Sequence, residues 1–269
     1  MKNFSFGNLV EGLIALVVGM FALGAQAGTI VGSDHDLSAL TTNTDQVCVF
    51  CHTPHGSDSS SPVPLWNKKL PTGTTYNRYS TLNVGSFDGA EAPVSGSISI
   101  ACLSCHDGGQ AMDVVLNKPG AGGYNGAGSE IDTGAIGTMP GDGIPLSQPI
   151  PNLGTDLRDD HPISVQFAGG GCDDTTCTTA SINDKDFNIP TQGTASNGQT
   201  IWWYDDGDTF REKDEVQFYT RTDFDGTTVE PSVECASCHD VHNGTDLPDV
   251  QFMRVTTAAS AICVTCHIK

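Results

Sequence analysis

The sequence predicts a chain that is mostly coil, with short helices at four cysteine motifs and few short strands. Aromatic residues make up 7% of the chain and hydrophobic residues 38%, whereas glycine occurs 31 times and proline 14 times. Beyond the N-terminal segment, long apolar stretches with a helical or strand period are hard to find. Such a chain buries too little of its own surface to offset the entropy lost on ordering. We therefore expect something other than side chains to form the core.

The cysteine motifs indicate what that core is. Eight of the ten cysteines fall in four C-x-x-C-H units: CVFCH, CLSCH, CASCH and CVTCH. C-x-x-C-H is the attachment motif of c-type haem, in which two thiols bond the haem vinyl groups and the histidine ligates iron. We predict the fold class of a multihaem cytochrome c, with four covalently attached haems forming the core. The attachment residues are Cys48, Cys51, Cys102, Cys105, Cys235, Cys238, Cys263 and Cys266, and the proximal iron ligands are His52, His106, His239 and His267.

Two other chemistries use paired cysteines. Two C-x-x-C units can close a Cys₄ zinc site, and a single unit can act as a redox dithiol. Neither chemistry needs a histidine directly after every second cysteine, and all four units here have one. The motifs therefore favour haem.

The remaining histidines match the open iron positions. The chain has eight histidines, and the four outside the motifs are His35, His55, His161 and His242. Four haems need four distal ligands, so the count predicts two histidines on every iron. Methionine is the competing ligand, and the methionines beyond the N-terminal segment are Met112, Met139 and Met253.

The spacing of the histidines suggests which haem each one serves. His55 follows His52 by three residues, and His242 follows His239 by three, so each pair would share one face of a helical turn. A histidine placed there reaches a neighbouring haem more easily than its own. We expect His55 at the second haem and His242 at the fourth. His35 and His161 then serve the first and third haems or their equivalents in another subunit. The order His, C-x-x-C-H-x-x-H, C-x-x-C-H occurs in residues 35–106 and again in 161–267, which indicates a duplication.

The N-terminus has the features of a secretory signal. One lysine precedes an apolar run over 13–23, and Ala25-Gln26-Ala27 forms a small-x-small cleavage site. We expect cleavage after Ala27 (residues 1–27), with no membrane span in the mature protein. The formal net charge of −20 argues against nucleic acid and anionic lipid as partners.

The mature chain divides into two halves in this interpretation. Residues 28–118 form an N-terminal dihaem half, 119–155 a Gly/Pro-rich connector and 156–269 a C-terminal dihaem half. The segments SISIACLSCH and VQFYTRT are candidate strands. Cys172 and Cys177 lack a following histidine and suggest a local disulfide, with a fifth haem as the alternative. The acidic segments WYDDGD and DFDGTT are interpreted as solvated surface.

Seven segments together resemble the secreted tetrahaem cytochromes of the OmcE type. They are DHDLS, CVFCHTPHG, PLWNKK, CLSCHDG, DDHPISVQF, VECASCHDVH and ICVTCH, and they cover most of the mature chain. The resemblance implies protomers that polymerise into extracellular conductive filaments, with one distal histidine given to the adjacent protomer. His35, near the mature N-terminus, is the candidate for that role. The implied partners are further copies of the chain and other redox cytochromes or an extracellular acceptor.

The expected function is electron transport along closely stacked haems. A filament subunit is the first hypothesis, and a monomeric periplasmic tetrahaem shuttle is the second. An enzyme is the third, but catalysis at haem needs an open iron position, and here a histidine is available for every one. The sequence therefore argues for an electron-transfer protein and against an enzyme.

Overall fold

The computed structural model describes residues 30–268 except 86, 121, 135, 140–151, 209 and 244–251. The predicted signal segment and the middle of the predicted connector lie outside the described residues. The strands are β1 (Val114–Lys118), β2 (Gly123–Glu130), β3 (Val165–Gln166), β4 (Thr191–Thr194), β5 (Thr200–Trp203), β6 (Gln217–Arg221) and β7 (Glu230–Val233). The α-helices are α2 (Ser99–His106), α3 (Cys235–Cys238) and α4 (Ala261–Cys266). Short 3-10 helices are η1 (Leu37–Leu40), η2 (Val47–Phe50), η3 (Tyr79–Leu82), η4 (Val94–Gly96), η5 (Phe167–Gly169) and η6 (Ala258–Ser260).

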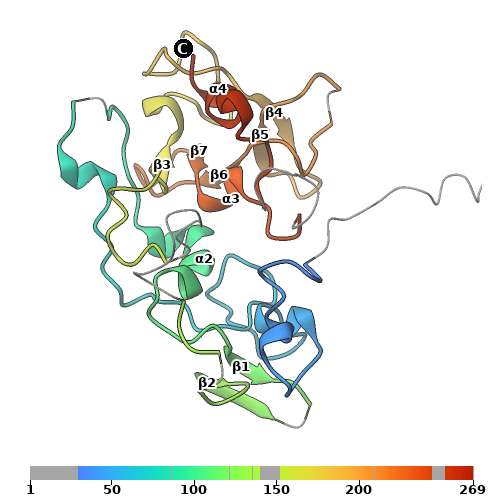
Figure 1. Ribbon diagram of the computed structural model, residues 1–269. Helices are drawn as coiled ribbons and strands as arrows, with labels where there is room; N and C mark the ends of the chain where they lie inside the picture. The colour runs from blue at the N-terminus through green and yellow to red at the C-terminus, as the bar shows by residue number, and fades with distance from the viewer. Residues whose placement is uncertain are drawn as a thin grey trace, which may run out of the picture.

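A five-stranded antiparallel sheet organises the C-terminal part of the chain (Figure 1). Its strand order is β3-β7-β6-β5-β4. The strands β5 and β6 are rich in β-branched and aromatic residues, which suit a half-buried pleated surface. Trp202 of β5 pairs with Phe218 of β6, and both pack with Phe167 in the core beneath the sheet. The predicted strand in VQFYTRT is confirmed as β6.

A separate hairpin of β1 and β2 lies at the other end of the molecule (Figure 1). The two strands are antiparallel, with a register irregularity between Val115 and Asn117. Most of β2 is exposed, whereas Val115 of β1 is fully buried against Leu37, Phe50 and Ile131. The hairpin spans the position where the sequence places the start of a connector.

The predicted fold class is wrong. The chain is β-rich, with two antiparallel sheets and few helices, rather than mostly coil around haems. Its own apolar side chains form three buried clusters, centred on Ile100, on Trp202 and on Phe50. Glycine and proline are concentrated in the connections, so overall composition understated the strand-forming character of short segments such as TIWW. The segment SISIACLSCH is also not a strand, because α2 begins at Ser99.

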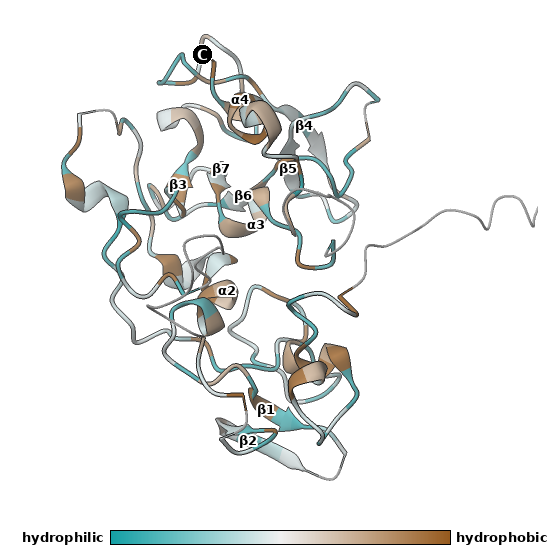
Figure 2. Cartoon of the chain, in the orientation of Figure 1, coloured by the Kyte–Doolittle hydropathy of each residue, from teal (hydrophilic) through white to brown (hydrophobic). Residues whose placement is uncertain are grey.

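Helix α2 lies between the two sheets (Figure 1). Its residues Ile100 and Leu103 are fully buried, and they pack with Trp66, Leu70 and others in one of the clusters. Figure 2 shows apolar residues on parts of the helices, on β5 and on the first part of β1, while the end of β1 is hydrophilic and β2 is near neutral. Within the described residues, none of the helices has both the length and the apolar character needed to cross a membrane.

Candidate metal centre: four C-x-x-C-H motifs and eight histidines

The first motif is held by a strand-like segment that comes after it in the chain. Helix η2 carries Cys48, and the His52 N–H donates to the Cys48 carbonyl at 2.8 Å. His52 then forms an antiparallel bridge with Trp66. The Asn67 N–H donates to the Cys51 carbonyl at 2.8 Å, and the Asn67 side chain donates to the Val49 carbonyl at 2.7 Å. The C-x-x-C loop is therefore fixed at both its cysteines.

The third motif repeats this arrangement bond for bond. Helix α3 ends at Cys238, and His239 bridges Met253, which follows it by the same number of residues as Trp66 follows His52. The Arg254 N–H donates to the Cys238 carbonyl at 2.8 Å, and its Nε donates to the Ala236 carbonyl at 3.0 Å. The equivalent bonds support the duplication that the sequence suggests.

The two units also share a rare backbone conformation. Leu65, just before Trp66, has a φ of 56°, and Phe252, just before Met253, has a φ of 64°. Bulky side chains seldom adopt this left-handed region. This conformation recurs at equivalent positions, so the two turns have the same local structure. In both, the turn brings the strand-like segment back against the C-x-x-C-H motif.

The expectation that each H-x-x-H pair shares a helical turn is wrong. His239 caps α3 in an extended conformation, with φ −109° and ψ 141°. His52 is likewise drawn into a bridge with Trp66. Because the backbone is extended at the proximal histidine, the residue three positions on does not lie on the same face.

The second and fourth motifs are built differently. Helix α2 continues through His106, whose carbonyl accepts from the Leu153 N–H at 2.7 Å. At the fourth motif, His267 caps α4 and bridges Phe187, with the two rings 4.4 Å apart. Here the partner segment precedes the motif in the chain rather than following it.

Two pairs of histidines from distant parts of the chain face each other. The ring centroids of His52 and His242 are 6.3 Å apart, and those of His35 and His106 are 6.1 Å apart. With metal–nitrogen bonds of about 2.0–2.1 Å, two imidazoles on opposite sides of one metal ion place their centroids roughly 6.3 Å apart. Both centroid separations match that spacing, with the ring planes at 74° to each other in the His35–His106 pair and at 19° in the His52–His242 pair.

His35 has the state that a metal ligand requires. Burial, together with the nearby His106, lowers the pKa of His35 to about 4, so the imidazole is neutral at pH 7. Its Nδ1 atom is buried without a hydrogen-bond partner. The ring of Phe252 covers it at a centroid distance of 4.3 Å. A neutral, half-buried imidazole with a buried, unsatisfied nitrogen is consistent with metal ligation.

His55 and His161 are placed on the surface. The His55 carbonyl accepts from the Asn117 side chain at 2.6 Å, and His161 Nδ1 lies 3.0 Å from the Pro162 carbonyl. Within the described part of the chain, neither ring contacts another histidine. The neighbours of His35 and His242 thus differ from those that spacing suggested, since His35 meets the second motif and His242 meets the first.

Consecutive motifs are spatial neighbours. The Cys102 thiol donates a hydrogen bond to the Cys235 sulfur, which raises the pKa of Cys102 and lowers that of Cys235. Burial raises the pKa of Cys51 to about 11, and the charge of a Cys105 thiolate adds to this rise. Burial also raises the pKa of Cys266 to about 12, with Cys238 as the next contribution. Sulfur atoms of motifs that are consecutive in the chain are thus close enough to influence one another, and the His52–His242 contact also brings the first motif beside the third.

A buried ionic network joins the second and third motifs, and no motif in the sequence predicts it. Glu234, directly before Cys235, is 1% exposed and pairs with Arg221 at 3.2 Å. Its carboxylate also accepts from three serine hydroxyls, at 2.6 Å (Ser99), 3.2 Å (Ser164) and 2.7 Å (Ser232). The Ser99 hydroxyl in turn accepts from the Cys235 N–H at 3.0 Å. The start of α2 and the start of α3 are thereby tied to one carboxylate.

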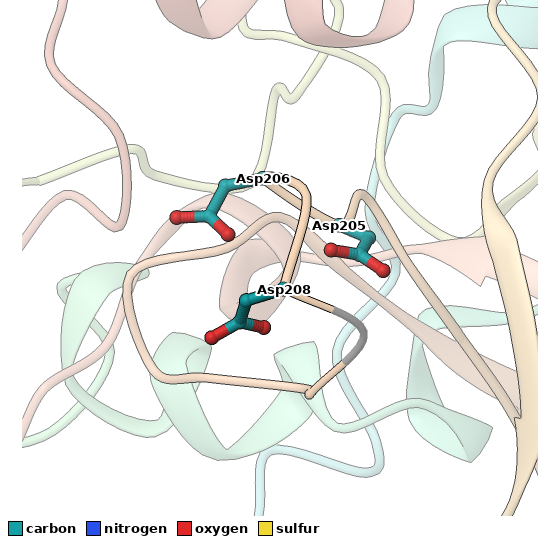
Figure 3. A group of neighbouring side chains, drawn as sticks. All are labelled: Asp205, Asp206 and Asp208. Carbon is teal, nitrogen blue, oxygen red and sulfur yellow. The ribbon is translucent and has the colours of Figure 1, made fainter.

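Two further features lie outside the motifs. The predicted disulfide between Cys172 and Cys177 is present. Asp205, Asp206 and Asp208 gather on the loop after β5, with carboxylate oxygens within 4.8 Å of one another (Figure 3). Two of the three are exposed, as expected for solvated surface, and we assign the cluster no ligand.

The donor geometry does not suit the zinc alternative. Among the described residues, which include all four motifs, no three motif cysteines or histidines bring their ligand atoms within 4.8 Å of one another. A tetrahedral Cys₄ site needs such a gathering.

A scan of the chain against protein-family models found no match, and neither did a search of curated proteins.

Proposed function

We propose that this protein is a tetrahaem c-type cytochrome that carries electrons along closely spaced haems. The observation that carries the proposal is the pairing of motif histidines with distant histidines at 6.1 and 6.3 Å. Four C-x-x-C-H units supply the thioether cysteines and proximal ligands. Haem bound there supplies one-electron chemistry, and two imidazoles on each iron leave no position for a substrate. The protein is accordingly an electron carrier rather than an enzyme.

The chain's own residues have distinct tasks in this proposal. His106 and His35 would hold the second haem, and His52 and His242 would hold the first. Among the described residues, neither His239 nor His267 has a second histidine ring at such a distance, and the exposed His55 and His161 are the histidines left for those two haems. This assignment favours His35 as a ligand within its own chain over the adjacent-protomer role that the resemblance implies.

The electron path follows the order of the motifs. Thiols of adjacent motifs are neighbours from the first motif to the fourth. Cys48 and Cys263, in the two terminal motifs, are exposed, whereas the other six motif cysteines are half-buried. In Figure 1, η2 and α4 lie toward opposite ends of the molecule. Electrons enter at one exposed terminal motif and leave at the other.

The exposed terminal motifs favour end-to-end assembly. A second copy placed against either end continues the path, so we propose that the secreted protein forms an extracellular filament of identical subunits. The alternative is a periplasmic shuttle that exchanges electrons with other cytochromes at the same two ends. Electron microscopy of native protein from the cell surface separates them, because long uniform filaments support the first and discrete particles under filament-preserving conditions support the second.

The ligand assignment has its own test. Unassembled protein should give a low-spin ferric signal from the His106 haem in electron paramagnetic resonance, and His35→Ala should convert one haem per chain to high spin. If His35 serves another subunit, unassembled wild-type protein already contains that high-spin haem and the variant leaves its spectrum unchanged. That second outcome would refute ligation of His106's haem by His35 of the same chain.

A further inference from the structure

Lys68 is a buried cation beside the first motif. Lys68 is 1% exposed, whereas the adjacent Lys69 lies on the surface. Lysine is almost never fully buried unless it is paired, because removing the ammonium group from water is costly. The position therefore requires an explanation beyond packing.

The partners of Lys68 are neutral. Its Nζ donates to the carbonyl of Met112 at 2.8 Å and to the carbonyl of Val114 at 2.9 Å. Within the described part of the chain, no ion pair joins Lys68 to a carboxylate. Asp113, between the two acceptor residues, directs its carboxylate to the Asp132 N–H at 2.9 Å. Lys68 Nζ is thus bonded to two carbonyl dipoles and to no carboxylate, and the second oxygen of the fully buried Asp113 carboxylate has no hydrogen-bond partner.

The same lysine is fixed close to the haem-attachment cysteines. The preceding residue, Asn67, bonds the Cys51 carbonyl through its N–H at 2.8 Å. The backbone thus ties Lys68 to the first C-x-x-C loop.

We propose that Lys68 is the fixed charge that raises the reduction potential of the haem attached at Cys48 and Cys51. This inference rests on the proposed tetrahaem function. An oxidised haem iron carries one more positive charge than a reduced one, so a nearby buried cation disfavours the oxidised form. A unit charge on the order of 10 Å away, at an effective dielectric constant of about 20, changes a one-electron equilibrium roughly tenfold.

The two other buried cations beside the motifs, Arg221 and Arg254, both have carboxylate partners. Arg221 is paired with Glu234 and Asp223, at 3.2 and 2.6 Å, and Arg254 is paired with Asp240 at 3.7 Å. Among the described residues, Lys68 is therefore the buried cation at a motif without an ion pair, and its charge biases one end of the haem path. Electrons on the chain should reside preferentially at the first haem, which makes that end the natural exit side.

The test is a potentiometric titration of the haem-loaded protein, followed by its visible absorption. Lys68→Met should lower the ratio of reduced to oxidised haem about tenfold at a fixed potential, equivalent to about 59 mV for one electron. The shift should be confined to the part of the signal that belongs to one haem of the four. Lys69→Met, which removes the same charge one residue away on the surface, should superimpose on wild type.

Two more variants keep the test decisive. Lys68→Gln retains a donor for the two carbonyls without the charge and should shift as Lys68→Met does, even if the methionine variant folds poorly. Lys68→Arg retains the charge and should titrate like wild type. A Lys68→Gln curve that overlies Lys69→Met, in protein carrying four haems, would overturn the role of Lys68. Fewer than four haems per wild-type chain in a haemochromogen assay would instead overturn the proposed function.

Discussion

Glu234 offers the most direct test of how the two halves are held together. Its carboxylate is 1% exposed, pairs with Arg221 at 3.2 Å and accepts hydrogen bonds from three serines. Replacing it by alanine leaves the Arg221 guanidinium without its buried partner and three hydroxyls without their acceptor. Removal of one partner from a buried ion pair costs about 3–5 kcal/mol of unfolding free energy. Arg221 keeps Asp223 at 2.6 Å, so we expect Glu234→Ala to fall near the lower end, about 3 kcal/mol.

The assay is urea unfolding of the purified protein followed by far-ultraviolet circular dichroism. The loss of unfolding free energy should appear as a lower midpoint with an unchanged slope. The matched control is Glu212→Ala, because Glu212 is exposed and the charges of Asp208 and Asp214 repel its carboxylate. That variant should leave the midpoint at the wild-type value. If Glu234→Ala unfolds at the same midpoint as Glu212→Ala, the network does not join the halves as argued.

Three other variants test separate features. Combining Cys172→Ala with Cys177→Ala removes a disulfide that closes a short loop. The double variant should lose about 2 kcal/mol of unfolding free energy in a thermal unfolding experiment, and an unchanged Tm would contradict this. Gly171→Ala should destabilise the protein far more than Gly198→Ala. Both glycines have positive φ, but only at Gly171 would a Cβ lie 2.2 Å from a carbonyl oxygen, that of Ser181. His242→Ala should produce one high-spin haem per chain while Val241→Ala does not, and equal spectra would exclude His242 as a ligand.

The sequence carries the local chemistry of this protein but little of its architecture. The C-x-x-C-H motif can be recognised from the sequence because its cysteines and histidine are neighbours in the chain. The pairing of His52 with His242 cannot be predicted from the sequence, because it depends on how two segments almost two hundred residues apart fold together. Spacing favoured His55 for a nearby haem, yet the extended backbone at His52 removes the geometry that the argument assumed.

The prediction of the fold class was wrong for a different reason. Composition averages over the chain, so the glycine-rich connections masked strands as short as β5 and β7. β7 contains Pro231 and Glu230, which are depleted in strands, and only its pairing with β3 and β6 makes it one. Lys68 was equally invisible, because nothing in PLWNKK distinguishes the buried lysine from the exposed one beside it.

The measurement that tests the central claim most directly is the intact mass of the native protein, taken together with its electron paramagnetic resonance spectrum. We predict a mass that exceeds that of the polypeptide by four haems, and ferric signals that are entirely low-spin in the assembled protein. A mass equal to the polypeptide alone, or a dominant high-spin signal in the native assembly, would contradict the account of a tetrahaem electron carrier with two histidines on every iron.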